Sequence, residues 1–235
     1  MPRIVVLGCG TNVGKTRVAV ALLEELRRRG HTCLGLKPIE SGIETGGLNA
    51  EPPTNSDAAR LANAGSARPS VQHPLYALRD PVSPHLAARA AAIQLDLQAV
   101  ARWVATAENA MTPHVMPRGA LWTVVETAGG VFSPLSQHTT NFDLGLALEP
   151  ARWLLVAADA LGVLHDVSAT HQAMQARGRP HDYLVLSAAR EPDLSTGTNA
   201  AELASLGIAK PSAVLARDDD RGISPLVDRL LDEEP

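Results

Sequence analysis

Residues 4–16 read IVVLGCGTNVGKT: an apolar run, Ile4–Leu7, leads into a glycine-rich turn that ends on Gly14-Lys15-Thr16. A strand that passes through such a turn into a helix leaves backbone N–H groups free at the helix N-terminus, where they and the helix dipole favour an anion. In phosphate-binding loops of this kind, the lysine reaches the β- and γ-phosphates and the neighbouring hydroxyl contacts Mg²⁺. The stretch therefore predicts a phosphate cradle that includes Lys15 and Thr16.

The spacing of the glycines departs from the strict motif G-x-x-x-x-G-K-[ST], whose first glycine would fall at position 9, where this chain has Cys9. Gly8 lies one residue too early and Gly10 one residue too late. The context still matches, because an apolar strand precedes the turn and a helical pattern follows it. A chance Gly-Lys-Thr after a glycine turn is the alternative, and the agreement of strand, turn and helix disfavours it.

Strand and helix patterns alternate along the chain. Apolar residues recur at three- and four-residue spacing up to Leu26, and Gly30 follows as a helix C-cap. A short strand at 32–37 completes a strand–helix–strand unit, which implies parallel pairing. Further strands are expected at 121–125, 153–157, 183–186 and 213–216, and further helices at 85–92, 95–111, 162–176, 199–206 and 225–232. We therefore expect one P-loop α/β domain over residues 1–235, with a mostly parallel central sheet and helices on both faces.

One segment, 40–53, is expected to be a mobile loop, and a second, 68–84, is expected to be an extended stretch. Residues 40–53 are rich in Gly, Glu, Pro and Thr, and residues 68–84 contain four prolines. Between them, Asn55-Ser56-Asp57 precedes the apolar Ala58 and Leu61, which is typical of a helix N-cap. Loops that follow the carboxyl ends of strands in an open α/β sheet commonly carry function.

Composition and charge disfavour several classes of partner. The 235-residue chain is 45% hydrophobic and carries a net charge of −4, which argues against a nucleic-acid partner. No apolar run approaches the roughly 18 residues that cross a bilayer, and no N-terminal targeting pattern is present. Cys9 and Cys33 form neither a disulfide framework nor a Cys-x-x-Cys metal pair. We expect a cytoplasmic protein without nucleic-acid or membrane partners.

Three residues outside the turn are candidates for phosphate or metal chemistry. Glu126 follows a strongly apolar strand and precedes small residues up to Gly130, so its carboxylate is placed for Mg²⁺; a polar residue that merely ends a strand is the alternative. Asp57 is either a second metal ligand or a helix cap, and spacing alone leaves both open. Lys37, at the end of the second strand, either meets a transferred phosphoryl group or faces solvent.

Five motifs occur in order: G-x-x-T-x-V-G-K-T at 8–16, K-P-x-x-S-G at 37–42, N-S-D at 55–57, S-P-H at 83–85 and E-x-A-G-G-x-x-x-P-L at 126–135. Together they resemble the dethiobiotin synthetase family over roughly residues 4–170. The resemblance implies an ATP- and Mg²⁺-dependent homodimer with a P-loop α/β fold. The activity it implies is closure of the ureido ring of dethiobiotin from 7,8-diaminononanoate (diaminopelargonate) and CO₂, in biotin biosynthesis.

The resemblance also implies a role for each residue that matches the family's motifs. The triphosphate would be wrapped by Asn12, Val13, Gly14, Lys15, Thr16 and Arg17, and the rest of the nucleotide site would be Asp57, Glu126, Thr127, Ala128, Gly129 and Ser187. Mg²⁺ would be held by Thr16, Asp57 and Glu126. Lys37 and Lys15 would be catalytic, by neutralising the γ-phosphate. The substrate would contact Thr11 and Ser41 at its carbamate, and Leu161 and Gly162 at its tail carboxylate across the dimer interface.

The chain departs from the family pattern at several positions. Gly10 replaces an aspartate, Thr127 replaces the first glycine of E-G-A-G-G, and Ala160 replaces the lysine of a K-L-G turn. From about residue 180 the divergence grows: Ser187 stands where an adenine-reading asparagine is expected, and no G-x-I-P turn follows. A short hydroxyl offers fewer hydrogen bonds than an amide, so the sequence predicts weak discrimination among nucleotide bases.

Two other functions would share the phosphate cradle. A related P-loop synthetase that acts on another carboxylate is expected to carry a glutaminase domain in the same chain. A MinD/ParA-like nucleotide switch is expected to carry a lysine near the start of its P-loop, and no residue from Gly8 to Gly14 is lysine. Ring closure is the leading hypothesis.

Overall fold

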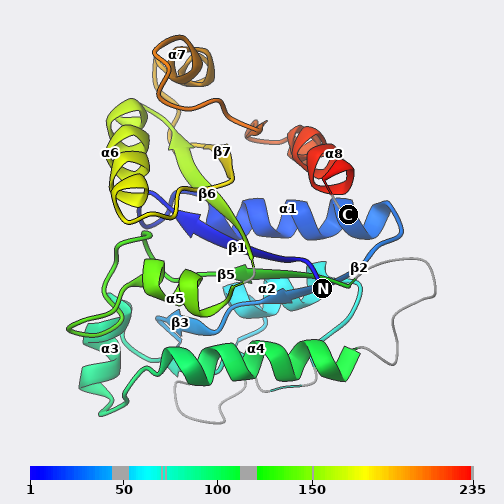
Figure 1. Cartoon of the computed structure of the whole chain (residues 1–235), viewed down its shortest axis with the longest axis vertical. Coiled ribbons are helices and arrows are strands. Elements are labelled where there is room, and N and C mark those ends of the chain that lie inside the picture. The colour runs from blue at the N-terminus through cyan, green and yellow to red at the C-terminus, as the bar shows by residue number, and fades with distance from the viewer. Residues whose placement is uncertain (44–52, 70, 72, 112–120, 150, 234–235) are drawn as a thin grey trace.

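A computed structural model describes residues 1–43, 53–69, 71, 73–111, 121–149 and 151–233 (Figure 1). Its main sheet has six strands in the order β2-β5-β1-β6-β7-β8, and every neighbouring pair is parallel. The strands are β1 (Arg3–Gly8), β2 (Thr32–Leu36), β5 (Leu121–Glu126), β6 (Arg152–Asp159), β7 (Tyr183–Ala188) and β8 (Ala213–Leu215). The predicted parallel α/β fold is confirmed.

Helices cover both faces of the sheet, and Figure 1 shows α1 and α8 on one side of β1, with α4 and α5 on the other. Side chains alternate along β1, so that Ile4 and Val6 pack with one set of helices and Val5 and Leu7 with the other. The first set is α1 (Lys15–Arg28), α2 (Asp57–Ala64) and α8 (Ser224–Asp232). The second set is α3 (Pro84–Ala90), α4 (Leu97–Met111), α5 (Asn141–Ala147), α6 (Val163–Ala176) and α7 (Asn199–Ser205). Burial on both faces explains the near-continuous apolar runs in the sequence.

The first helix ends as its sequence indicates. Gly30 has φ 88°, a left-handed conformation that costs little without a Cβ atom. Its N–H donates to the carbonyl oxygen of Arg27, and the N–H of His31 donates to that of Leu26, both at 3.0 Å. This pair of bonds satisfies carbonyls at the end of α1 and directs the chain into β2.

A second, two-stranded parallel sheet was not predicted. It pairs β3 (Ile39–Ser41) with β4 (Tyr76–Leu78). β3 begins one residue before the segment 40–53 that was expected to be a loop, and β4 lies in the extended stretch at 68–84. The loop prediction is therefore wrong for Glu40 and Ser41, while positions 44–52, 70 and 72 lie outside the described residues. Three-residue strands are too short to show a periodicity, and these are held by pairing with each other and by the buried Ile39 and Leu78.

The parallel arrangement brings several chain segments to one edge of the sheet. The phosphate-cradle turn follows β1, Lys37 follows β2, and Glu126 ends β5, which lies between them. The carboxyl edge of an open α/β sheet is where ligands bind. A short 3₁₀ helix, Asp220–Ile223, packs against α1. Within the described ranges, no helix combines the length and the apolar character that crossing a membrane requires.

Candidate active site

The turn after β1 has the backbone geometry of an anion cradle. Asn12 and Gly14 adopt left-handed conformations, with φ 59° and 95°. Gly8 has no room for a side chain, because a Cβ atom would lie 2.9 Å from the carbonyl oxygen of Gly10 and 3.0 Å from Lys15 Nζ. Lys15 Nζ donates to that same Gly10 oxygen at 3.0 Å, so the ammonium lies across the turn.

Burial lowers the pKa of Lys15 to about 8, although the nearby carboxylate of Glu126 acts in the opposite direction. An anion bound in the cradle would favour the charged ammonium. Phosphate binding and protonation of Lys15 are therefore expected to be coupled.

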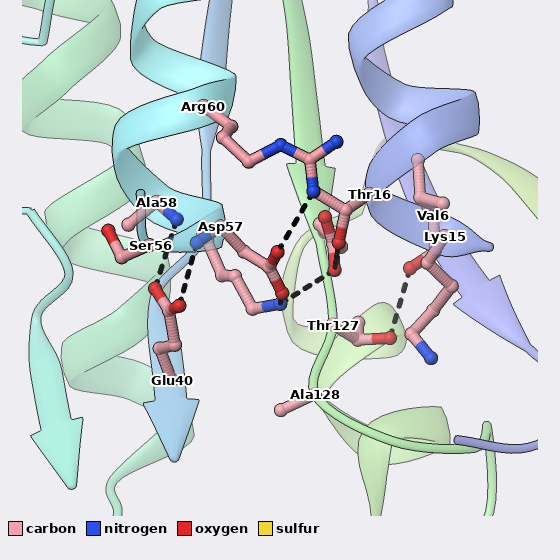
Figure 2. A network of polar contacts seen from close by, with 12 residues as sticks. Val6, Lys15, Thr16, Glu40, Ser56, Asp57, Ala58, Arg60, Thr127 and Ala128 are labelled. Atoms are coloured by element: carbon pink, nitrogen blue, oxygen red, sulfur yellow. Dashed lines mark hydrogen bonds and ion pairs between the residues drawn. The ribbon is translucent and has the colours of Figure 1, made fainter. Parts of the chain in front are cut away.

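Lys37 lies between two carboxylates, those of Asp57 and Glu126, and Figure 2 labels Asp57. Its Nζ atom is 2.7 Å from Asp57 Oδ2 and 2.7 Å from Glu126 Oε1, and its side chain is 7% exposed. Burial alone would lower the pKa of the Lys37 ammonium, but the carboxylates of Glu126 and Asp57 outweigh the effect of burial and raise this pKa. Burial likewise acts against the charge of Asp57, but Lys37 outweighs it and lowers the pKa of that carboxyl. The pair is therefore fully charged at neutral pH.

Asp57 is not the cap of α2. Ser56 is the N-cap residue, and its Oγ accepts the N–H of Ala59 at 3.1 Å. The Asp57 carboxylate instead contacts Lys37, with Arg60 Nη1 3.6 Å from its other oxygen. Of the two roles that the sequence left open for Asp57, the helix cap is wrong.

The cluster offers suitable ligands for Mg²⁺. Glu126 is 1% exposed, and its Oε2 atom is buried with no hydrogen-bond partner among the described residues. The Thr16 hydroxyl donates to Glu126 Oε1 at 2.9 Å, so a hydroxyl and two carboxylates lie together beside the cradle. Hard oxygen donors are what Mg²⁺ prefers, and it is commonly bound by one or two carboxylates plus substrate phosphates. An orphaned carboxylate oxygen fits such an ion.

The turn after β5 is held from two sides. Thr127 is buried, and its hydroxyl donates to the carbonyl oxygen of Val6 at 3.0 Å (Figure 2). The side chain that Thr127 carries in place of a glycine therefore lies against β1. Asn141 Nδ2, at the start of α5, donates to the carbonyl oxygens of Ala128 at 2.6 Å and Gly130 at 2.9 Å. Sequence reasoning missed α5 and Asn141. The signal was the capping box formed by Thr140 and its N3 aspartate.

The residues expected at the substrate fall into two groups. Thr11 is exposed, and its Oγ1 would lie 3.8 Å from a Cβ atom on Gly129, so it faces the turn after β5. Ser41 follows Glu40 on β3, and its hydroxyl is buried without a partner in the described structure. Leu161 and Gly162 lie apart from these, in the turn that enters α6.

The turn before α6 already holds a carboxylate. Leu161 N–H donates to Asp193 Oδ2 at 2.8 Å, while the Leu161 side chain is 85% exposed. Gly162 adopts φ 99° and is the N-cap of the helix. Among the described residues, no hydrogen bond or ion pair connects this turn with Lys37.

Two residues expected at the nucleotide have other neighbours. Ser187 is fully buried, and a Cβ atom on Gly14 would overlap its Oγ, which has no hydrogen-bond partner in the described part of the chain. Arg17 donates from Nε and Nη2 to Asp220 Oδ1, at 2.9 and 2.7 Å, and also to the carbonyl oxygen of Ala216. Ser187 therefore supports the cradle from behind, and Arg17 connects α1 to the segment after β8.

A parallel sheet with this cradle and these cations at its carboxyl edge defines a P-loop nucleotide-binding protein. Solved structures have a similar fold: the MinC:MinD cell division protein complex of Aquifex aeolicus has a TM-score of 0.53 at 12% identity, covering 100% of this chain and 97% of that chain. A ParA family ATPase from Chlorobium tepidum TLS has a TM-score of 0.52 at 11% identity, covering 99% of this chain and 93% of that one. At such low identity the likeness shows the fold alone.

Sequence relatives narrow this class. A family model described as "AAA domain" matches residues 2–217. Two curated relatives are named ATP-dependent dethiobiotin synthetase BioD. The protein from Anaeromyxobacter dehalogenans (strain 2CP-C) is 37% identical over 94% of this chain and 92% of its own length. The protein from Caulobacter vibrioides (strain NA1000 / CB15N) is 34% identical over 83% of this chain and 84% of its own length. The chain belongs to the dethiobiotin synthetase family, as its five motifs indicate.

Proposed function

We propose that this chain uses ATP to close the ureido ring of dethiobiotin from 7,8-diaminononanoate and CO₂. The observation that carries the proposal is the convergence of Lys37, Asp57 and Glu126 beside the phosphate cradle, in a member of this family. The arrangement supplies two lysines and two carboxylates at a place where a triphosphate binds. Phosphoryl transfer depends mainly on positioning and on charge, which these groups provide.

The reaction balances without a protein nucleophile. A substrate amine adds to CO₂ and forms a carbamate, whose oxygen attacks the γ-phosphorus of ATP while ADP leaves. The second amine then attacks the carbonyl carbon of the mixed anhydride, the ring closes, and inorganic phosphate departs. Charge grows first on the transferring phosphoryl group and then on the leaving phosphate, so cations are the groups that accelerate both steps.

Each cluster residue has a part in this proposal. Lys15 neutralises the phosphates from within the cradle, and Lys37 does so from the end of β2. Thr16, Asp57 and Glu126 would hold Mg²⁺, which would neutralise part of the phosphate charge when it is bound. The buried, unpaired Oε2 of Glu126 supports this assignment.

The backbone around the cradle completes the proposed nucleotide site. Asn12, Val13 and Gly14 would offer their amides to the triphosphate. The turn after β5 would complete the site, because Gly129 and Gly130 lie beside residues 9–11 of the cradle. Thr11 and Ser41 would contact the carbamate, as the family resemblance implies.

We also propose that the chain acts as a homodimer and that residues 1–235 form one domain. Leu161 and Leu194 are highly exposed apolar side chains at the α6 turn and the loop facing it, which supports an interface there. In the dimer, the amides at Leu161 and Gly162 would receive the tail carboxylate of the substrate bound to the other protomer, and this carboxylate would take the place of Asp193 Oδ2 at the Leu161 amide. Sedimentation equilibrium is expected to give twice the chain mass, and a monomer at micromolar concentration would contradict the dimer.

The activity is tested with purified protein, diaminononanoate, bicarbonate, Mg²⁺ and ATP. We expect dethiobiotin and inorganic phosphate in equal amounts, measured by mass spectrometry and a phosphate assay. Omission of diaminononanoate is the control, because a nucleotide-switch ATPase would release phosphate without it. Phosphate release at an equal rate in both reactions, without dethiobiotin, would contradict the proposed function.

A further inference from the structure

The carboxylate of Glu40 binds the first turn of α2. Glu40 lies on β3 and is 7% exposed. Its Oε1 atom accepts the N–H of Asp57 at 2.8 Å, and its Oε2 atom accepts the N–H of Ala58 at 2.9 Å (Figure 2). A carboxylate that accepts two amides at a helix N-terminus gains from both the hydrogen bonds and the helix dipole.

These contacts complete the hydrogen bonding of the α2 N-terminus. Ser56 Oγ accepts the N–H of Ala59 at 3.1 Å, and the carbonyl oxygen of Ser56 accepts the N–H of Arg60 at 3.0 Å. Together with the two bonds to Glu40, every amide of the first turn then has a partner. Both oxygens of Glu40 are engaged by the backbone, so this carboxylate supports its neighbour rather than facing the cradle.

Glu40 and Lys37 hold Asp57 from the same short segment. Lys37 binds the Asp57 carboxylate at 2.7 Å, and Glu40 binds the Asp57 backbone at 2.8 Å. The segment itself is fixed, because β3 pairs with β4 in register, Glu40 opposite Ala77. Asp57 is thus held at its main chain and at its side chain by residues from one segment.

We propose that Glu40 is a positioning residue that fixes the backbone of Asp57, so that the Asp57 carboxylate faces Glu126 and the cradle. The consequence is that Glu40 sets the affinity of the metal site without contacting the metal. This inference rests on the proposed function, because it takes Asp57 as a ligand of Mg²⁺. Groups that orient metal ligands typically change metal affinity about 10- to 100-fold when they are replaced.

The test measures Mn²⁺ binding by electron paramagnetic resonance, in the presence of a non-hydrolysable ATP analogue. In Glu40→Gln, the side-chain amide can accept one backbone N–H, but its NH₂ group meets the other donor. We expect the dissociation constant of Mn²⁺ to rise about tenfold. Glu40→Asp retains the charge on a shorter side chain that cannot reach both amides, and the same direction is expected. Circular dichroism confirms that each variant is folded.

Ser56→Ala is the matched control. It removes the cap that binds Ala59 from the same first turn, and it leaves both bonds of Glu40 in place. We expect Mn²⁺ binding within about twofold of wild type, whatever the loss of stability. Equal weakening by Ser56→Ala and Glu40→Gln would overturn the proposal, because it would trace the effect to helix stability in general.

A double-mutant cycle with Asp57→Asn decides whether Glu40 acts through Asp57. When the Asp57 carboxylate is absent, adding Glu40→Gln is expected to cause no further loss of Mn²⁺ binding. A full, additive loss would overturn the proposal, as would wild-type affinity in both Glu40 variants. Wild-type protein that binds no Mn²⁺ would instead refute the proposed metal site, and the inference with it.

Discussion

Replacement of Lys37 by methionine removes the ammonium that lies 2.7 Å from Asp57 Oδ2 and from Glu126 Oε1. Methionine is unbranched and similarly flexible, so the change chiefly removes the charge. Glu126 is 1% exposed, and breaking a buried ion pair by removing one partner typically costs about 3–5 kcal/mol. Asp57 is 35% exposed on its side chain, so solvent screens its share. For a chain of this size each kcal/mol lowers Tm by roughly 2–4 °C, so we expect a decrease of about 10 °C.

The assay is thermal unfolding of the nucleotide-free protein at pH 7, with and without Mg²⁺. A divalent cation can take the place of the lost ammonium between the carboxylates, so Mg²⁺ is expected to raise the Tm of Lys37→Met more than that of wild type. Turnover is expected to fall at least about 100-fold, because a group aimed at developing charge contributes roughly 3–4 kcal/mol.

Arg60→Met is the matched control for this experiment. Arg60 contacts the same Asp57 carboxylate at 3.6 Å, but from the exposed side. Exposed ion pairs contribute at most about 1 kcal/mol, so a change of no more than a few degrees is expected. The reasoning is refuted if Lys37→Met unfolds at the wild-type temperature and retains turnover within about tenfold of wild type.

Three further expectations concern the metal, pH and the base. Glu126→Gln removes an anionic oxygen donor, so the Mg²⁺ concentration that gives half-maximal ring closure is expected to rise at least about tenfold. If this Mg²⁺ concentration does not change, Glu126 is not a ligand of the metal. Burial holds the pKa of Lys15 at about 8 in the free protein, so the ammonium is charged below pH 8 and loses its proton above it. The affinity for ATP should therefore be insensitive to the state of Lys15 below pH 8 and fall up to about tenfold per pH unit above it. Calorimetry at pH 9 should show that the protein takes up a proton when ATP binds. No proton uptake at pH 9 would contradict this coupling. With Ser187 buried behind Gly14, the nucleoside triphosphates should support rates within about tenfold, roughly 1.4 kcal/mol, whereas a hundredfold preference for ATP would show that another residue reads the base.

The parts of the site that could be predicted are those encoded locally. The strand, turn and helix around Lys15 are contiguous, and Glu126 directly follows the five mostly apolar residues 121–125, so their relation to the sheet follows from periodicity alone. The parallel order then brings Lys37 and Glu126 to one edge, which the sequence also predicted. These features depend on backbone geometry that neighbouring residues impose.

The parts that could not be predicted depend on contacts between distant segments. The choice between ligand and cap for Asp57 is decided by Ser56 and by the approach of Lys37, which spacing does not encode. Glu40 is the clearest case, because nothing near it in sequence reveals that it binds amides 17 and 18 residues further along the chain. The burial of Ser187 behind the cradle likewise follows from the packing of β7 beside α1.

The most direct test of the account is an isotope experiment on ring closure. If the carbamate oxygen attacks the γ-phosphorus and the second amine then displaces phosphate, one oxygen atom of CO₂ must leave with that phosphate. A rapid single turnover with diaminononanoate, ATP, Mg²⁺ and ¹⁸O-labelled bicarbonate is expected to yield dethiobiotin and inorganic phosphate that carries one ¹⁸O atom, measured by mass spectrometry. Dethiobiotin accompanied by unlabelled phosphate, or labelled bicarbonate with no ring product, would contradict the proposed reaction at this site.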